Sequence, residues 1–203
     1  MMPAARESLL DAAYAALAHR PWSGVRMVDV AAAAGVSRQT LYNEFGSKNG
    51  LARALARREA DAYLAGVDRA LTAHGDPRER LTAAAEWTVA AARENPLVRA
   101  VLTGCWGERL PAPARTSGPS TSSVPAQRRA DGPLPSPGDV VALVRDRAVH
   151  ALAGPGAGHV DTADLARSCE LVVRLALSCV TAPPGNGGVA DLVRGALHRR
   201  PPP

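Results

Sequence analysis

The sequence predicts an all-α protein of about nine helices. Hydrophobic residues make up 46% of the 203 positions, but many of them are alanine, and aromatic residues account for only 3%. A core built from Ala, Leu and Val suits closely packed helices, because small side chains let helix backbones approach one another. Valine is scattered along the chain and does not alternate with polar residues, which argues against a sheet.

Three short helical segments are expected within residues 1–50. They are residues 6–19, 28–34 and 38–44. Apolar residues recur at helical spacing in the first segment, and Pro21 interrupts the pattern after it. Gly35 closes the second segment, because glycine readily adopts the left-handed conformation of a helix end. Ser37 is a suitable N-cap for the third segment, which Gly46 ends.

The remaining helices are longer and form the rest of the chain. They are expected at residues 48–73 and 78–94, from Pro96 onward, and at residues 138–153, 161–182 and 188–198. Residues 111–137 are rich in Pro, Ser and Gly and cannot bury enough apolar surface to offset the entropy lost on ordering, so they are expected to form a flexible loop. We therefore divide the chain into a domain of residues 1–50 and a second domain of residues 51–203.

The stretch "AGVSRQTLYNEFGSK", residues 34–48, carries the clearest chemical signal. It joins two short helices by a turn in which Gly35 lets the chain reverse and Val36 supplies an apolar plug. Leu41 and Phe45 are four residues apart and are expected to point inward. The outward positions hold side chains that bond to base edges or phosphates, namely Arg38, Gln39, Thr40, Tyr42 and Asn43. Polar residues in the first turn of a second helix are typical of a recognition helix in a DNA major groove.

The segment "VDVAAAAGVSRQTLYNEFGSKNGLARAL" resembles the helix-turn-helix signature of the TetR/AcrR family of regulators, over about residues 8–60. The resemblance implies an N-terminal three-helix DNA-binding domain, a C-terminal bundle for ligand binding and dimerisation, and a homodimer. It places Tyr42 and Lys48 where family members commonly touch the phosphate backbone. The candidate DNA-binding residues are Arg26, Ser37, Arg38, Gln39, Thr40, Tyr42, Asn43 and Lys48.

One position departs from the family pattern. Members usually carry a threonine at the start of the second helix, where its side chain caps the helix and contacts a phosphate. Here Arg26 or Met27 occupies that place. Loss of the cap costs about 1 kcal/mol, and Arg26 is a candidate to supply the phosphate contact instead.

The C-terminal half matches no motif, so its site residues rest on the family layout alone. Tyr63, Trp87 and Trp106 are the large side chains available to line a ligand pocket, although a tryptophan in a helical bundle also serves as core. In the family the last two helices of each subunit form the dimer interface. The candidates for that interface are Leu165, Leu171, Val172, Leu175, Ala176 and Cys179.

Composition restricts the other classes of function. The formal net charge of +5 permits an anionic partner. The three cysteines and five histidines lack metal-ligand spacing, so we expect neither a metal nor a cofactor. Ser, His and Asp show no catalytic signature, which argues against an enzyme. No apolar run reaches the roughly 20 residues of a membrane span, and Glu7 and Asp11 interrupt the first apolar segment, so we expect a cytoplasmic protein without membrane contact.

The function predicted from the sequence is that of a dimeric transcriptional regulator, taken to be a repressor. Its two recognition helices would enter major grooves of double-stranded, pseudo-palindromic operator DNA, about 34–36 Å apart for one helical turn. A small-molecule effector, guessed to be largely apolar, would release the DNA. Two alternatives stay open: a regulator that answers to a protein partner or to no ligand, and a helical enzyme.

Overall fold

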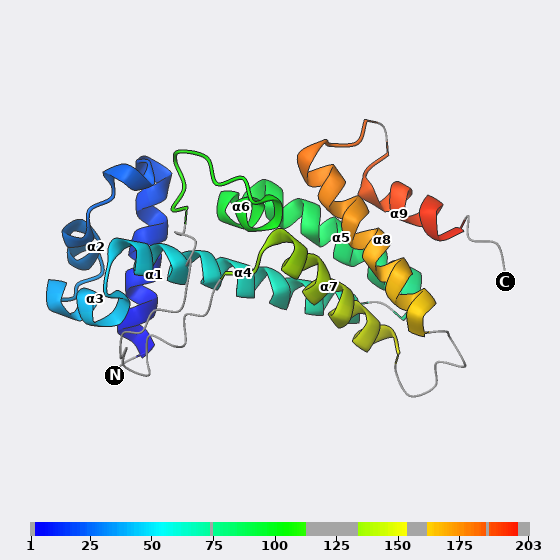
Figure 1. Cartoon of the computed structure of the whole chain (residues 1–203), viewed down its shortest axis with the longest axis horizontal. Helices are drawn as coiled ribbons and strands as arrows, with labels where there is room; N and C mark the ends of the chain where they lie inside the picture. Colours follow the sequence, from blue (N-terminus) through cyan, green and yellow to red (C-terminus); the bar gives the residue numbers. More distant parts are fainter. Residues whose placement is uncertain (1–2, 74, 113–133, 154–161, 186, 199–203) are drawn as a thin grey trace. The chain divides into compact units, whose positions relative to one another are not determined.

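The computed structural model describes residues 3–73, 75–112, 134–153, 162–185 and 187–198. Over these residues the chain forms nine α-helices and one 3-10 helix, and no strand (Figure 1). The all-α prediction is therefore confirmed. No helix within these ranges is long and apolar enough to cross a membrane. The chain divides into two compact units, and along the sequence the first boundary falls between Glu59 and Ala60.

The first unit contains the N-terminal helices. They are α1 (Pro3–His19), η1 (Trp22–Gly24), α2 (Met27–Ala33), α3 (Arg38–Phe45) and the first half of α4 (Lys48–Thr72). Helices α1, α2 and α3 pack against one another, as Figure 1 shows in blue and cyan. Their small core is buried and includes Leu9, Leu10, Trp22, Val30, Leu41, Phe45, Leu51 and Leu55.

Residues 106–112, which follow α6 in the chain, also belong to the first unit. The backbone N–H of Trp22 donates to the carbonyl oxygen of Arg109 at 2.9 Å. The sequence did not predict that residues 106–112 return to the first unit. The first boundary, at Glu59, lies nine residues beyond the expected one at residue 50. Most of the loop predicted at residues 111–137 lies outside the described residues, and α7 already begins at Pro137.

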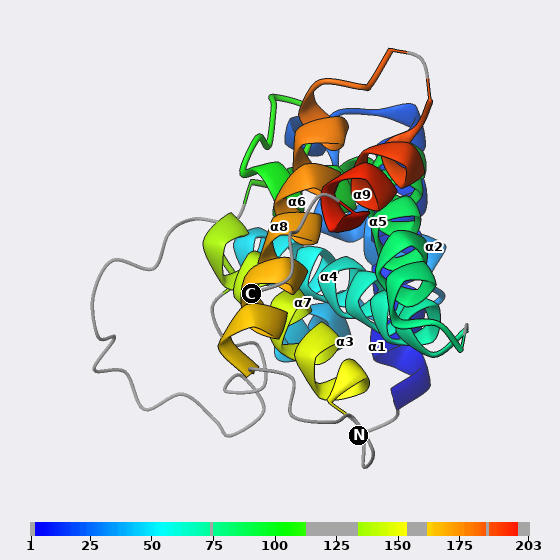
Figure 2. The same ribbon diagram turned by 90° about the vertical axis from the view of Figure 1, so that its right-hand side faces the viewer.

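The second unit holds the rest of α4 and five further helices. They are α5 (Pro77–Glu94), α6 (Pro96–Thr103), α7 (Pro137–Leu152), α8 (Thr162–Thr181) and α9 (Val189–His198). Helix α8 packs on α5 and α7, while α9 packs on α5 and α8, an arrangement seen from two directions in Figures 1 and 2.

Three helices of the second unit begin with the same local chemistry. A polar N-cap accepts a backbone N–H of the first turn, and a proline follows at the first helical position, where its missing N–H costs nothing. The pairs are Asp76 and Pro77, Asn95 and Pro96, and Ser136 and Pro137. Asp139 completes a reciprocal capping box with Ser136. These starts follow directly from the sequence.

Candidate nucleic-acid interface

The turn between α2 and α3 is built by local hydrogen bonds. Gly35 has a φ of 67° and donates its N–H to the Ala32 carbonyl at 3.1 Å, while the Val36 N–H reaches the Ala31 carbonyl at 3.0 Å. Ser37 caps α3, because its Oγ accepts the Thr40 N–H at 3.0 Å. The capping prediction for Ser37 is confirmed. This turn fixes the start of α3 and so the direction of its first polar side chains.

Helix α3 has one buried face and one exposed face. Leu41 is 0% and Phe45 4% exposed, as their spacing predicted. On the opposite face Gln39 Nε2 donates to Asn43 Oδ1 at 2.8 Å, and the Arg38 guanidinium lies 5.4 Å from the centre of the Tyr42 ring. The exposed side chains therefore hold one another in place before any ligand binds.

Lys48, the first residue of α4, is anchored to η1. Its Nζ donates to the Ser23 carbonyl at 3.1 Å and lies 5.4 Å from the centre of the Trp22 ring. Partial burial lowers the pKa of the Lys48 ammonium. An ammonium has three donors, and the Ser23 bond uses one. The phosphate contact inferred for Lys48 stays a prediction, and Trp22 is a supporting residue that the sequence did not reveal.

Arg26 is the N-cap residue of α2, which resolves the choice between Arg26 and Met27. Its side chain caps no backbone N–H. Its Nε and Nη2 instead donate to the two carboxylate oxygens of Asp29, each at 3.0 Å. This pairing lowers the pKa of Asp29 and raises that of Arg26. The Arg26 side chain is 74% exposed, so it still faces solvent.

Helix α1 is tied to α3 and α4 by arginines. Arg6 lies 4.9 Å from the centre of the Phe45 ring and 3.6 Å from Glu44. Arg58 on α4 pairs with Asp11 on α1 at 2.7 Å and with Glu59 at 3.0 Å. Asp11 and Arg58 are 47 residues apart in the sequence, so their pairing joins two distant segments. These contacts support the recognition helix from behind.

Two of the three predicted ligand-binding residues come together in the second unit. The Tyr63 hydroxyl is hydrogen bonded to Thr88 Oγ1 at 3.0 Å, and Trp87 Nε1 donates to the Tyr63 carbonyl at 3.0 Å. Burial raises the pKa of Tyr63 to about 12. Trp106 is half-buried and belongs to the first unit. A role in ligand binding stays a prediction for all three.

A separate cavity of about 10 Å³ lies between α5, α7 and α8. Its walls are apolar except for one threonine, and consist of Leu81, Ala84, Ala85, Thr88, Val144, Ala148, Val172, Val173 and Ala176. The volume is that of about one water molecule. The sequence did not reveal this cavity, because its walls are ordinary core residues.

The residues predicted for the dimer interface lie on two different faces of α8. Val172, Ala176 and Cys179 are 3% exposed or less within the single chain, and the first two line the cavity just described. These three side chains pack into the core of the chain itself. Leu171 is 45% exposed, and Leu165 and Leu175 are half-buried. A role in the dimer interface stays a prediction for all six residues.

The geometry defines the class of protein: an all-helical, DNA-binding protein of the helix-turn-helix type. Residues 9–55 match the family of bacterial regulatory proteins called the tetR family. The transcriptional regulator AlkX of Mycobacterium tuberculosis is 35% identical over 193 residues, which cover 93% of this chain and 82% of AlkX. The chain belongs to the TetR family of transcriptional regulators.

Two further relatives match. The transcriptional activator FasR of Mycolicibacterium smegmatis is 40% identical over 81 residues, or 40% of this chain and 37% of FasR. The crystal structure of a TetR family repressor, AlkX of a Dietzia strain, implicated in biodegradation of n-alkanes, covers 94% of this chain and 92% of its own with a TM-score of 0.54 and 24% identity. This structure shares the fold.

Proposed function

We propose that the protein is a homodimeric repressor that binds a pseudo-palindromic operator through α3 and releases it when an apolar effector enters the second unit. One observation carries the proposal: α3 buries Leu41 and Phe45 and exposes polar side chains on its opposite face, where contacts between them fix their positions. Arg38 and Gln39 are suited to guanine and adenine edges, and Tyr42 and Lys48 to phosphates. A bacterial regulator of this kind acts on the chromosome, in the cytoplasm.

Enrichment of genomic DNA fragments by the purified protein tests DNA binding. The expected result is a set of fragments that share a two-fold symmetric sequence and are lost when Arg38 and Gln39 are both changed to alanine. Equal enrichment by the wild type and the double variant would overturn the proposal. A matched control is Arg99→Gln, an exposed arginine of α6 in the second unit, which should enrich the same fragments as the wild type.

We favour repression over activation as the effect of this protein on transcription. AlkX of M. tuberculosis, whose match spans most of this chain, shares its name with a TetR family repressor of a Dietzia strain, whereas FasR, with a shorter match, is an activator. Transcription in vitro from an enriched promoter decides between them. A repressor lowers the transcript level, and a rise would reverse the proposed sign.

Dimerisation is proposed through α8 and α9. Leu171 on α8 and Leu192 on α9 are 45% and 44% exposed, which leaves apolar surface on both helices for a partner subunit to bury. Leu171→Asp should convert the dimer into a monomer in sedimentation measurements. Leu143→Asp is the control, because Leu143 on α7 is also 37% exposed but lies outside the proposed interface. Dimers in both variants would exclude this surface.

The effector is proposed to enter the cavity between α5, α7 and α8. Its apolar walls suit an apolar molecule, which must spread the helices because the cavity holds only about 10 Å³. Ala84→Val narrows the cavity. It should abolish release of DNA by whichever compound of a hydrocarbon panel releases the wild-type protein, while DNA binding persists. An unchanged response would place the effector elsewhere.

Helix α4 is the proposed path of the signal, because it runs from Lys48 in the first unit to Thr72 in the second. Trp87 ties α5 to this helix by its bond to Tyr63 and by its ring, which occupies the space a side chain at Gly66 would take. A spread of α5 would therefore move α4. To take the DNA-bound fraction from 99% to 1% requires about 5.5 kcal/mol of differential effector affinity.

A further inference from the structure

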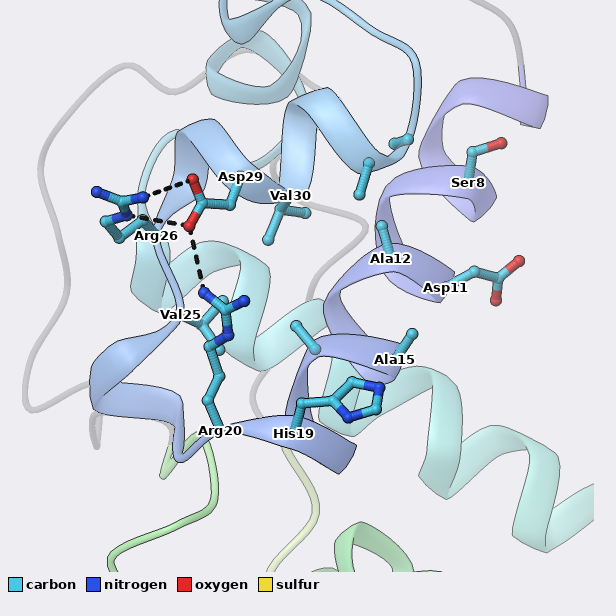
Figure 3. Close-up of a pocket in the computed structure, with 13 residues that line it drawn as sticks. Ser8, Asp11, Ala12, Ala15, His19, Arg20, Val25, Arg26, Asp29 and Val30 are labelled. Atoms are coloured by element: carbon cyan, nitrogen blue, oxygen red, sulfur yellow. Dashed lines mark hydrogen bonds and ion pairs between the residues drawn. The ribbon is translucent and has the colours of Figure 1, made fainter.

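Asp29 joins two arginines that come from opposite ends of the α1–α2 turn. Arg26 donates to both carboxylate oxygens at 3.0 Å, and Arg20 Nη1 lies 3.4 Å from Oδ2 (Figure 3). In Figure 3 the two guanidinium groups approach the carboxylate from different sides at one edge of the groove between α1 and α2. The groove has a volume of about 610 Å³ and a floor of alanine and valine side chains.

The cluster keeps a surplus of positive charge and of hydrogen-bond donors. A guanidinium has five N–H donors. The bonds to Asp29 use two from Arg26 and one from Arg20. The side chains are 74% and 49% exposed, so their remaining donors are accessible to a ligand. Two cations held by one carboxylate leave a net charge of +1, which suits an oxyanion.

The same turn also holds Lys48. The carbonyl of Ser23, in the middle of the turn, accepts a hydrogen bond from the Lys48 ammonium at 3.1 Å. Arg20 and Arg26 bracket the turn, so three cations are fixed to one seven-residue segment. Two of them, Arg26 and Lys48, are already candidates for phosphate contact. Arg20 was not singled out from the sequence, because its link to the others runs through Asp29, nine residues away.

We propose that Arg20 is a further phosphate-contacting residue of the DNA interface, and that Asp29 is a positioning residue which holds Arg20 and Arg26 as a paired site for the operator backbone. The proposal rests on the proposed function. Without the carboxylate the two guanidinium groups repel each other and lose their common orientation. Bidentate arginines recognise a phosphate through such fixed orientation.

The sign of the Asp29→Asn effect separates positioning from simple charge. Asparagine removes a negative charge, so an effect of net charge alone would tighten DNA binding. Positioning predicts weaker binding, by about three- to tenfold at 150 mM salt, because the arginines lose their shared anchor. The Arg20→Gln variant should bind more weakly as well, with a slope of log affinity against log salt that is shallower by about 0.9 per head, or about 1.8 per dimer.

The experiment measures fluorescence anisotropy of an enriched genomic fragment from 50 to 200 mM salt, with wild type, Arg20→Gln, Arg20→Lys, Asp29→Asn and Arg99→Gln. Arg20→Lys should restore the slope but not the full affinity. An unchanged slope in Arg20→Gln overturns the contact, and tighter binding by Asp29→Asn overturns the positioning role. Thermal melts identify any unfolded variant. The Arg20 side chain is exposed, so Arg20→Gln should remain folded and should still test the phosphate contact if Asp29→Asn unfolds. Failure of the wild type to bind any fragment would instead refute the proposed function.

Discussion

Gly50 is the position at which a single methyl group should separate α3 from α4. A Cβ built on Gly50 would lie 1.9 Å from the carbonyl oxygen and 3.0 Å from the carbonyl carbon of Phe45. Real Cβ atoms essentially never approach within 3.0 Å of another heavy atom, so the two backbones must move apart by about 1.1 Å, which is 3.0 minus 1.9 Å. The Phe45 carbonyl also accepts the Ser47 N–H at 2.8 Å and cannot rotate away freely.

Two opposing terms set the size of the Gly50→Ala effect. Replacing glycine by alanine inside a helix ordinarily stabilises it by about 1 kcal/mol. Overpacking costs about 1–3 kcal/mol, and more where backbone must move. The added Cβ would meet backbone atoms, which cannot move aside as a flexible side chain can. We therefore expect the cost of overpacking to exceed the gain in helix propensity, and the free energy of unfolding to fall by about 1–2 kcal/mol. That corresponds to a melting temperature lower by roughly 2–8 °C for a chain of this size.

Thermal unfolding followed by circular dichroism measures the effect, and DNA affinity should fall with it because α3 is displaced. Gly24→Ala is the matched control. Nothing lies within 4 Å of a Cβ at Gly24, so its melting temperature should stay within about 2 °C of the wild type. A Gly50→Ala protein that melts at or above the wild-type temperature would show that the backbones accommodate the methyl group without this cost.

Three further predictions follow from the same structure. Lys48→Ala should weaken binding to every DNA sequence and reduce the salt slope by about 0.9 per head; an unchanged slope would remove Lys48 from the interface. Gln39→Ala should relax preference at one base position in a binding selection, whereas uniform weakening would mean a backbone contact. Tyr63 has its pKa raised to about 12 in the folded chain, so its contribution to stability is complete below pH 10 and lost as pH rises toward 12. Urea unfolding should show that loss in wild type and a smaller one in Tyr63→Phe, and identical pH profiles would contradict it.

The parts of the fold that depend on neighbouring residues were predictable from sequence. Ser37 caps α3 and Gly46 ends it because capping and left-handed turns are decided within a few residues. Leu41 and Phe45 point inward because their spacing leaves one apolar face. The remaining, polar positions of α3 could therefore be assigned to its outward face.

Contacts between residues distant in sequence were not predictable. The Lys48 ammonium donates to the Ser23 carbonyl across 25 residues, and Asp29 pairs with Arg20, nine residues before it in the sequence. Helix α8 shows the same limit, because it has two apolar faces. Leu171 and Val172 are equally apolar neighbours, and only the packing of α5 and α7 decides that Val172 is buried and Leu171 exposed.

We propose that α3 reads operator DNA from the major groove, with Arg38 as a base-contacting residue. Methylation interference on an enriched fragment tests it directly, because guanine N7 lies in the major groove and adenine N3 in the minor groove. We expect that N7 methylation of a guanine in each half-site blocks binding of the wild-type protein. The Arg38→Ala protein should bind more weakly and should be insensitive to this methylation. Binding that is blocked only by adenine N3 methylation, or by the same guanines in both proteins, would exclude Arg38 as a base contact in the major groove.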